Sequence, residues 1–171
     1  MNVVLTGFMG TGKSTVGRVL ADRLGYTFVD TDTLIEQQHG PIPEIFAREG
    51  EAAFRSYEAD VAATLAEGTR QVIATGGRLM LDPANAAVLG ATGEVFALSA
   101  SADEVLRRVL GDDAAVRPLL AGDDPAGRVR SLLAERAPLY AQFPIIETGG
   151  RSPEDITEEI MNALETRGTN D

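Results

Sequence analysis

Gly7-Phe8-Met9-Gly10-Thr11-Gly12-Lys13-Ser14 follows a short apolar run, Val3-Val4-Leu5, and leads into a segment whose apolar residues recur with helical spacing. The stretch fits the pattern G-x-x-x-x-G-K-[ST] in full. The glycines allow the backbone to curl so that successive N–H groups face one anionic centre, and the N-terminus of the following helix adds to the attraction. A strand, a glycine-rich loop and a helix in this order predict an α/β protein with a phosphate-binding loop.

Lys13 is the only lysine among the 15 basic residues, and the others are arginines. At this place in the pattern a compact ammonium serves better than the broad planar fork of arginine. We expect Lys13 to contact the β- and γ-phosphates of a nucleotide and Ser14 to offer its hydroxyl to Mg²⁺. The alternative is a glycine-rich turn without a ligand, which would produce the full pattern by chance about once in a thousand such sequences.

Length and composition indicate one folded domain that covers residues 1–171. The chain is 44% hydrophobic and 24% charged, which is enough for a hydrophobic core. The lack of cysteine in the sequence excludes disulfides, thiolate nucleophiles and cysteine-based metal centres. The single histidine, His39, precedes Gly40-Pro41, and we interpret it as a helix-end residue rather than a catalyst.

The net charge of −11 disfavours nucleic acid and anionic membranes as partners. A small anionic substrate must therefore be held by a local cluster of bases that acts against the field of the whole protein. No run approaches the roughly 18 apolar residues of a membrane span, and the apolar start of the chain lacks the positive region of a signal peptide. We expect a cytoplasmic, monomeric protein.

Short apolar runs alternate with segments of helical pattern along the chain. The expected strands are 3–5, 27–29, 72–74, 94–98 and 144–146. The expected helices are about 14–24, 32–39, 43–49, 51–67, 82–89, 102–110, 126–137 and a last one from Pro153. This alternation predicts a parallel sheet with helices on both faces, and residues 31–67 and 111–125 are candidate insertions.

Asp30-Thr31-Asp32 follows the second predicted strand, at the carboxyl edge where open α/β sheets bind ligands. One carboxylate can meet Mg²⁺ through water, and the other can accept the proton of a substrate hydroxyl. Helix capping is the alternative interpretation, because Asp32 and Thr33 are good N-cap residues and Glu36 suits a capping box. The spacing alone leaves both interpretations open.

Two further segments suit an anionic ligand. Arg55 lies in a predicted helix, where it either binds a ligand or is a solvated residue paired with Glu51 or Glu58. Gly76-Gly77 ends the third predicted strand, and paired glycines allow either close approach of a ligand or a tight turn.

Two arginines lie in the C-terminal half of the chain. Arg117 falls in the acidic segment 111–125, where it is either a salt-bridge partner or a lid arginine that meets a transferring phosphate. Arg136 ends a predicted helix, a position where a base also suits the helix dipole.

Taken in order, these segments resemble the shikimate kinases, within the nucleoside-monophosphate-kinase-like branch of P-loop proteins. The resemblance covers nearly the whole chain, and the segments that carry it are GFMGTGKST at 7–15, DTD at 30–32, IF at 45–46, GE at 50–51, FR at 54–55, Glu58, TGG at 75–77, RPLL at 117–120 and RAPLY at 136–140. It implies a five-stranded P-loop kinase that moves the γ-phosphoryl group of ATP to the 3-hydroxyl of shikimate, in aromatic amino-acid biosynthesis.

The resemblance also implies a role for each matching residue. The implied ATP site comprises Gly10, Thr11, Gly12, Lys13, Ser14, Thr15, Arg108, Arg117 and Pro153. The implied Mg²⁺ ligands are Ser14 and Asp30. The implied acceptor site comprises Asp32, Arg55, Gly76, Gly77 and Arg136. Lys13 and Arg117 would hold the transferring phosphoryl group, and Asp32 is the candidate base. Residues 31–67 would move over the substrate and residues 111–125 would close as a lid.

One residue departs from the family pattern. The family usually has three glycines after the threonine of the third strand, and the third is replaced here by Arg78. Arg78 either crowds the substrate, points away from it or adds an anchor for a more anionic one. It keeps open a first alternative, a kinase for another hydroxylated carboxylic acid or polyol such as gluconate. A catalytically silent nucleotide-binding module is the second alternative.

Overall fold

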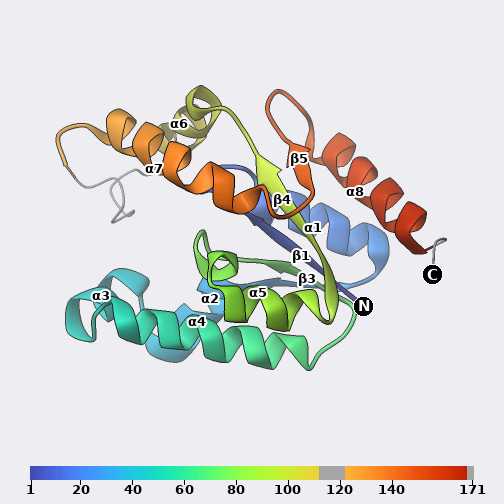
Figure 1. Ribbon diagram of the computed structural model, residues 1–171, viewed down its shortest axis with the longest axis horizontal. Coiled ribbons are helices and arrows are strands. Elements are labelled where there is room, and N and C mark those ends of the chain that lie inside the picture. Colours follow the sequence, from blue (N-terminus) through green and yellow to red (C-terminus); the bar gives the residue numbers. More distant parts are fainter. Residues whose placement is uncertain (112–121, 169–171) are drawn as a thin grey trace.

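The computed structural model describes residues 1–111 and 122–168. Its centre is a parallel sheet in the strand order β2-β3-β1-β4-β5. The strands are β1 (Asn2–Gly7), β2 (Thr27–Asp30), β3 (Gln71–Ala74), β4 (Gly93–Ser99) and β5 (Ile145–Glu147). Because all of them run in one direction, their C-terminal ends meet at one edge of the sheet (Figure 1). Residues 7–14, 30–32 and 75–77 lie at or directly after strand ends at this edge.

Helices connect the strands. Those of the described residues are α1 (Lys13–Leu24), α2 (Thr31–His39), α3 (Ile42–Arg48), α4 (Glu51–Ala66), α5 (Pro83–Gly90), α6 (Ala102–Gly111), α7 (Pro125–Tyr140) and α8 (Pro153–Gly168). A short 3-10 helix, η1 (Leu79–Leu81), lies between β3 and α5. α2, α3 and α4 lie between β2 and β3 and fall within residues 31–67, the segment for which substrate binding stays a prediction.

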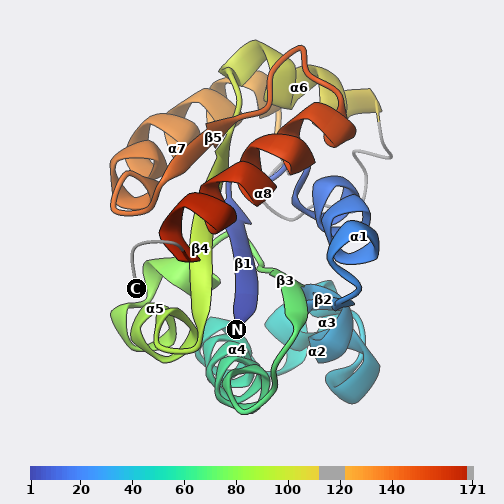
Figure 2. The same cartoon turned by 90° about the vertical axis from the view of Figure 1, so that its right-hand side faces the viewer.

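Successive side chains of β1 point to opposite faces of the sheet, and different helices cover the two faces. Val3 and Leu5 are buried with residues of α1 and α8, and Figure 2 shows these two helices together on one side of the strands. Val4 is buried with residues of α2 to α5 on the opposite face. Beyond the end of β1, Phe8 packs with α6 and α7. The central strand is therefore enclosed on both faces, which explains the apolar run Val3-Val4-Leu5 at its centre.

The predicted parallel sheet with helices on both faces is confirmed. Two elements differ from the predictions. Residues 79–81 form η1, where no element was expected. α7 continues through Pro138 to Tyr140, although a helix ending at 137 was predicted. Burial of the Tyr140 side chain among residues of α6 and α7 offsets the backbone hydrogen bond that Pro138 cannot donate.

Two predictions concern the outer parts of the molecule. Residues 112–121, the middle of the predicted lid, lie outside the described residues, and Arg117 is among them. Within 1–111 and 122–168, no helix combines the length and the apolar character needed to cross a membrane.

Candidate active site

The phosphate-binding loop joins the C-terminal end of β1 to the N-terminus of α1. Gly12 has a φ of 97°, a conformation that suits glycine, and Lys13 begins the helix directly after it. Lys13 Nζ donates to the carbonyl oxygens of Gly7 (2.7 Å) and Phe8 (2.9 Å). Thr11 Oγ1 also donates to Phe8 O at 2.7 Å. The loop thus combines a helix N-terminus with an ammonium group, which are the groups that bind phosphate.

Ser14 and Asp30, the predicted Mg²⁺ ligands, lie side by side. Ser14 Oγ donates to Asp30 Oδ2 at 2.8 Å. Around a Mg²⁺ ion with ligands at about 2.0–2.1 Å, neighbouring oxygen atoms of the octahedron are about 2.9 Å apart. A hydroxyl and a carboxylate oxygen at the observed separation therefore fit Mg²⁺, the cation that prefers oxygen ligands of this kind.

Asp30 rather than Asp32 caps α2. Asp30 Oδ1 accepts a hydrogen bond from the backbone N–H of Thr33 at 3.1 Å. Asp32 is the second residue of α2, so the interpretation of Asp32 as the cap is wrong. The capping box is absent too, because Glu36 accepts a hydrogen bond from Ile42 N at 3.2 Å instead. The carboxylate of Asp32 is therefore not used to begin the helix.

Asp32 lies against the glycines that follow β3. A Cβ atom built on Gly76 would be 2.5 Å from Asp32 Oδ1, so the carboxylate occupies the space that a side chain would need. Burial raises the pKa of Asp32 to about 6, and the negative charge of Asp30 contributes to the rise. The positive charges of Lys13 and Arg55 act in the opposite direction. Asp32 thus lies within electrostatic reach of both the phosphate loop and Arg55.

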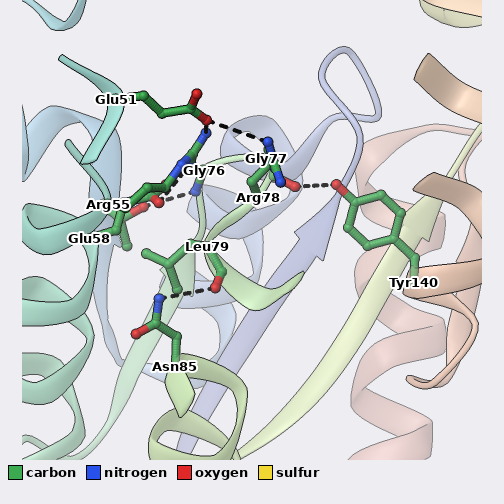
Figure 3. Close-up of polar contacts among 10 residues, drawn as sticks. Glu51, Arg55, Glu58, Gly76, Gly77, Arg78, Leu79, Asn85 and Tyr140 are labelled. Atoms are coloured by element: carbon green, nitrogen blue, oxygen red, sulfur yellow. Dashed lines mark hydrogen bonds and ion pairs between the residues drawn. The ribbon is translucent and has the colours of Figure 1, made fainter. Parts of the chain in front are cut away.

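The turn at Gly76 and Gly77 is held from both sides. Gly76 N donates to Thr31 Oγ1 at 2.9 Å, which ties the turn to α2. The hydroxyl of Tyr140, from the end of α7, donates to the carbonyl oxygen of Gly77 (Figure 3). Burial raises the pKa of Tyr140 to about 12, so this hydroxyl stays protonated at neutral pH. The two glycines provide both a tight turn and close approach to Asp32.

Arg55 projects from the first half of α4 and is held by two carboxylates of the same helix. Its Nη1 donates to Glu58 Oε2 at 2.8 Å, and its Nη2 donates to Glu51 Oε1 at 3.1 Å. The side chain of Glu58 is 3% exposed and that of Glu51 is 57% exposed. Both ion pairs suggested by the sequence are present, and they orient Arg55 rather than leaving it in solvent.

Arg136 is a buried arginine near the end of α7. The residue is 6% exposed, and its guanidinium lies 5.7 Å from the ring centroid of Phe8 in the phosphate loop. Burial is the main cause that lowers the pKa of Arg136, although an arginine remains charged. Among the described residues, no carboxylate forms an ion pair with it. A buried cation that has no ion-pair partner among the described residues is suited to binding an anion.

The predicted nucleotide-contacting residues outside the loop lie at the same edge of the sheet. Arg108 Nη1, from α6, donates to the carbonyl oxygen of Gly10 at 3.0 Å, and its Nη2 donates to Thr148 O at 3.2 Å. Thr148 follows β5, and its hydroxyl donates to Thr11 O at 3.0 Å. Pro153 begins α8 after the same loop. Thr15 is an exposed residue in the first turn of α1.

The structure therefore brings the predicted residues to one edge of the sheet, with Arg117 outside the described residues. Three residues without a predicted role hold the turn and the loop in place: Thr31, Tyr140 and Thr148. Tyr140 follows Arg136 by four residues, a helical spacing that places both on one side of α7. Nothing near Thr148 in the sequence indicates its contact with a loop that lies 137 residues away.

Comparison with known proteins agrees with this geometry. A family model described as shikimate kinase matches residues 9–165. The chain belongs to the shikimate kinase family. A shikimate kinase of Symbiobacterium thermophilum is 48% identical over 171 residues, which cover 98% of each chain. The structure described as a shikimate kinase from Acinetobacter baumannii in complex with shikimate has a TM-score of 0.90 and 37% identity, and the match covers 97% of this chain and 93% of that one.

A more distant similarity bears on the alternatives. A gluconokinase from Sinorhizobium meliloti has a TM-score of 0.67 at 18% identity, which shows a shared fold alone. The relatives with high identity over nearly the whole chain are named shikimate kinases. The comparisons thus support a small-molecule kinase of the shikimate pathway, and they support neither the gluconate kinase nor the silent nucleotide-binding module.

Proposed function

We propose that this chain transfers the γ-phosphoryl group of ATP to the 3-hydroxyl of shikimate and releases ADP. The observation that carries the proposal is the position of Asp32. Burial raises the pKa of this carboxylate to about 6, and the group lies within electrostatic reach of both Lys13 and Arg55. A hydroxyl bound at Asp32 would therefore have the phosphate loop on one side and a carboxylate-binding cation on the other. Membership of the shikimate kinase family supports the same acceptor.

The phosphate loop would bind the nucleotide. The residues proposed for this role are Gly10, Thr11, Gly12, Lys13, Ser14, Thr15, Arg108, Pro153 and, outside the described residues, Arg117. Phosphoryl transfer depends mainly on positioning and on neutralisation of the negative charge that spreads over the transferred group. Lys13 would supply that positive charge from the loop, and Arg117 would supply it from the lid.

Ser14 and Asp30 are the proposed ligands of Mg²⁺, directly or through water. When bound, the ion would neutralise charge on the β- and γ-phosphates. The hydrogen bond between Ser14 and Asp30 already holds their oxygen atoms at a suitable separation. Because Asp30 also caps α2, the same carboxylate fixes the start of the helix that carries Asp32.

Arg55 and Arg136 would bind the carboxylate of the acceptor from two helices. Arg136 is buried and lacks a carboxylate partner among the described residues, so an acceptor carboxylate would compensate its charge. Arg55 is oriented by Glu58, which is itself buried. The backbone at Gly76 and Gly77 would contact the acceptor between these arginines and Asp32.

Asp32 would accept the proton of the attacking hydroxyl. A general base works best when its pKa lies close to the pH of the reaction, because it is then both deprotonated and basic. Burial supplies this property to Asp32, while an ordinary exposed aspartate would be a far weaker base. Action as a monomer in the cytoplasm stays a prediction from the sequence.

Identification of the product tests the proposed reaction. ATP, Mg²⁺ and shikimate are incubated with the purified chain, and the product is examined by two-dimensional ³¹P–¹H NMR. We expect one phosphate monoester, coupled to the proton on C3 of shikimate, and we expect Lys13→Ala and Arg55→Ala to reduce its formation strongly. A phosphate on another hydroxyl, or full activity of the Arg55 variant, would contradict the proposed orientation.

A further inference from the structure

Arg78 follows directly after the Gly76–Gly77 turn and shares a counter-ion with Arg55. Its Nη1 lies 3.5 Å from Glu51 Oε1, and the same oxygen accepts a hydrogen bond from Arg55 Nη2 at 3.1 Å. Figure 3 shows the side chains of Arg55 and Arg78 converging on Glu51 from α4 and from the turn. Two guanidinium groups are thus separated by a single carboxylate oxygen.

The backbone at Arg78 accepts a side chain without strain. Its φ of −112° and ψ of −6° lie in the right-handed region, and the residue caps η1. The Arg78 side chain is 51% exposed, so it lies at the rim of the site rather than inside it. The arginine therefore neither distorts the turn nor fills the space beside Asp32, which lies at Gly76.

Arg78 also lies near the buried Arg136. A Cβ atom built on Gly77, the neighbour of Arg78, would be 3.7 Å from Arg136 Nη1. The positive charges of Arg78 and Arg55 both act on Arg136, in addition to the larger effect of burial. Three arginines from two helices and the turn thus lie within electrostatic reach of one another, and Glu51 and Glu58 form ion pairs with two of them, Arg55 and Arg78. Of the three arginines, Arg136 forms no ion pair with a carboxylate of the described residues, although the negative charge of Glu135 acts on it.

The two glutamates differ in how readily they can be replaced. Glu58 is buried and holds Arg55 at 2.8 Å, so removal of this pair would leave a buried charge. The side chain of Glu51 is 57% exposed, and its ion pair with Arg78 has a long N–O distance of 3.5 Å. An exposed ion pair of this length is weak, because water competes for both partners. Another carboxylate that enters the site can therefore replace Glu51 at small cost.

We propose that Arg78 is a third arginine of the acceptor site, which releases Glu51 and binds the carboxylate of the acceptor. This inference rests on the proposed function, because it names a further residue that recognises the same acceptor. It gives Arg78 a role in specificity: the exchange of one carboxylate for another favours an anionic acceptor over a neutral polyol of the same shape.

The test compares two acceptors that differ in one charge. Binding of shikimate and of its uncharged methyl ester is measured by isothermal titration calorimetry with the wild-type chain and with Arg78→Ala and Arg78→Lys. We expect Arg78→Ala to raise the Kd for shikimate about three- to tenfold and to change the Kd for the ester less than about twofold. Arg78→Lys keeps the positive charge but loses the planar guanidinium that can donate two hydrogen bonds to a carboxylate. Its effect on the Kd for shikimate should therefore be smaller than that of Arg78→Ala.

Arg23→Ala is the matched control. Arg23, in α1, pairs with Glu158 of α8 at 2.7 Å, and both side chains are exposed. The control removes one positive charge and one exposed ion pair, as Arg78→Ala does, but away from the acceptor site. We expect it to leave both Kd values unchanged, which separates a local effect of Arg78 from the effect of net charge.

Two results would overturn the role of Arg78. Equal changes in Kd for shikimate and for the ester would show that Arg78 acts through shape or folding, and unchanged values for both would show that it does not contact the carboxylate. The measurement does not depend on turnover. If the wild type binds shikimate without phosphorylating it, the proposed reaction fails while the comparison of Kd values still decides the role of Arg78.

Discussion

Asp32 illustrates how a single residue is placed for chemistry at the expense of stability. Its carboxylate is largely removed from water, beside Gly76 and near a second carboxylate, Asp30. The pKa of Asp32 is therefore about 6, while that of an unperturbed aspartate is 3.8. A carboxyl group with a raised pKa stabilises the folded state below the unfolded pKa, and this contribution is lost as the pH rises from about 4 through about 6.

The first prediction concerns the stability of Asp32→Asn. At pH 7.5 the wild type carries a partly buried negative charge that the variant lacks, so the variant should be more stable by about 1–3 kcal/mol and lose activity by a factor of about 10² or more. Urea unfolding at pH 7.5 and at pH 4 checks the first part, because the gain should shrink at the lower pH. A variant that is less stable at pH 7.5 would contradict the account of Asp32.

The second prediction concerns the pH dependence of turnover. The proposed base must be deprotonated, so kcat should be constant at neutral pH and fall as the pH decreases through about 6. Initial rates at saturating ATP and shikimate between pH 5 and 8 measure this directly. A fall that begins only near pH 4, the range of an ordinary aspartate, would mean that burial does not set the basicity of this group.

At the scale of an element, the turn after β3 connects the two halves of the acceptor site. Thr31 of α2 accepts a hydrogen bond from Gly76, and Tyr140 of α7 donates to Gly77. The position of Asp32 relative to Arg136 thus depends on two adjacent glycines. An atom added at Gly76 would displace Asp32, while one added at Gly77 would make an ordinary contact with Arg136 at 3.7 Å.

The third prediction is that Gly76→Ala reduces catalysis with little effect on folding. The new Cβ atom would be 2.5 Å from Asp32 Oδ1, so the carboxylate must move by a fraction of an ångström or more. Misplacement of a catalytic group by about 1 Å can cost about a hundredfold in rate, so we expect kcat to fall at least about tenfold. The unfolding free energy should change by less than about 1 kcal/mol, because the group that must yield is the end of a side chain.

Gly90→Ala provides the matched control for this variant. Gly90 ends α5, and no atom lies within 4 Å of a Cβ built there. The substitution adds the same methyl group and should leave kcat and KM unchanged. Equal loss of activity in both variants would indicate a general response to alanine, and full activity of Gly76→Ala would show that Asp32 tolerates displacement.

Elements also show what could be predicted from the sequence and what could not. Unbroken apolar runs such as Val3-Val4-Leu5 predicted the buried strands, because a strand covered on both faces has no polar side. The end of α7 was predicted too early, because a proline usually ends a helix, while the burial of Tyr140 favours one more turn. η1 carries no local signal, because three apolar residues after two glycines and an arginine fit several structures.

The same distinction holds for the candidate site: features with a local sequence pattern could be predicted, and features that depend on contacts between distant segments could not. A contiguous pattern predicted the phosphate loop, and Asp30 with Asp32 could be placed at a strand end by adjacency alone. Which of the two aspartates caps α2 could not be predicted, because both suit the position and tertiary contacts decide it. Arg136 is buried with its guanidinium over the ring of Phe8, which lies far away in the sequence, so helical spacing could not distinguish it from a surface residue.

At the scale of the whole molecule, a protein of net charge −11 holds a cluster of arginines at one edge of its sheet. Arg55, Arg78 and Arg136 come from α4, from the turn after β3 and from α7, so the fold rather than local sequence assembles the cluster. Because the net charge of the protein is unfavourable for an anionic acceptor, these side chains must attract it locally. The parallel sheet brings this cluster and the phosphate loop to the same edge.

The central claim is that this edge transfers phosphate from ATP to shikimate, and release of ADP tests it most directly. ADP formed from ATP and Mg²⁺ by the purified chain is measured with shikimate, with gluconate and with no acceptor. The account predicts sustained release with shikimate and only background release in the other two reactions. Release with gluconate but not shikimate, or binding of ATP without release in any of the three reactions, would contradict it.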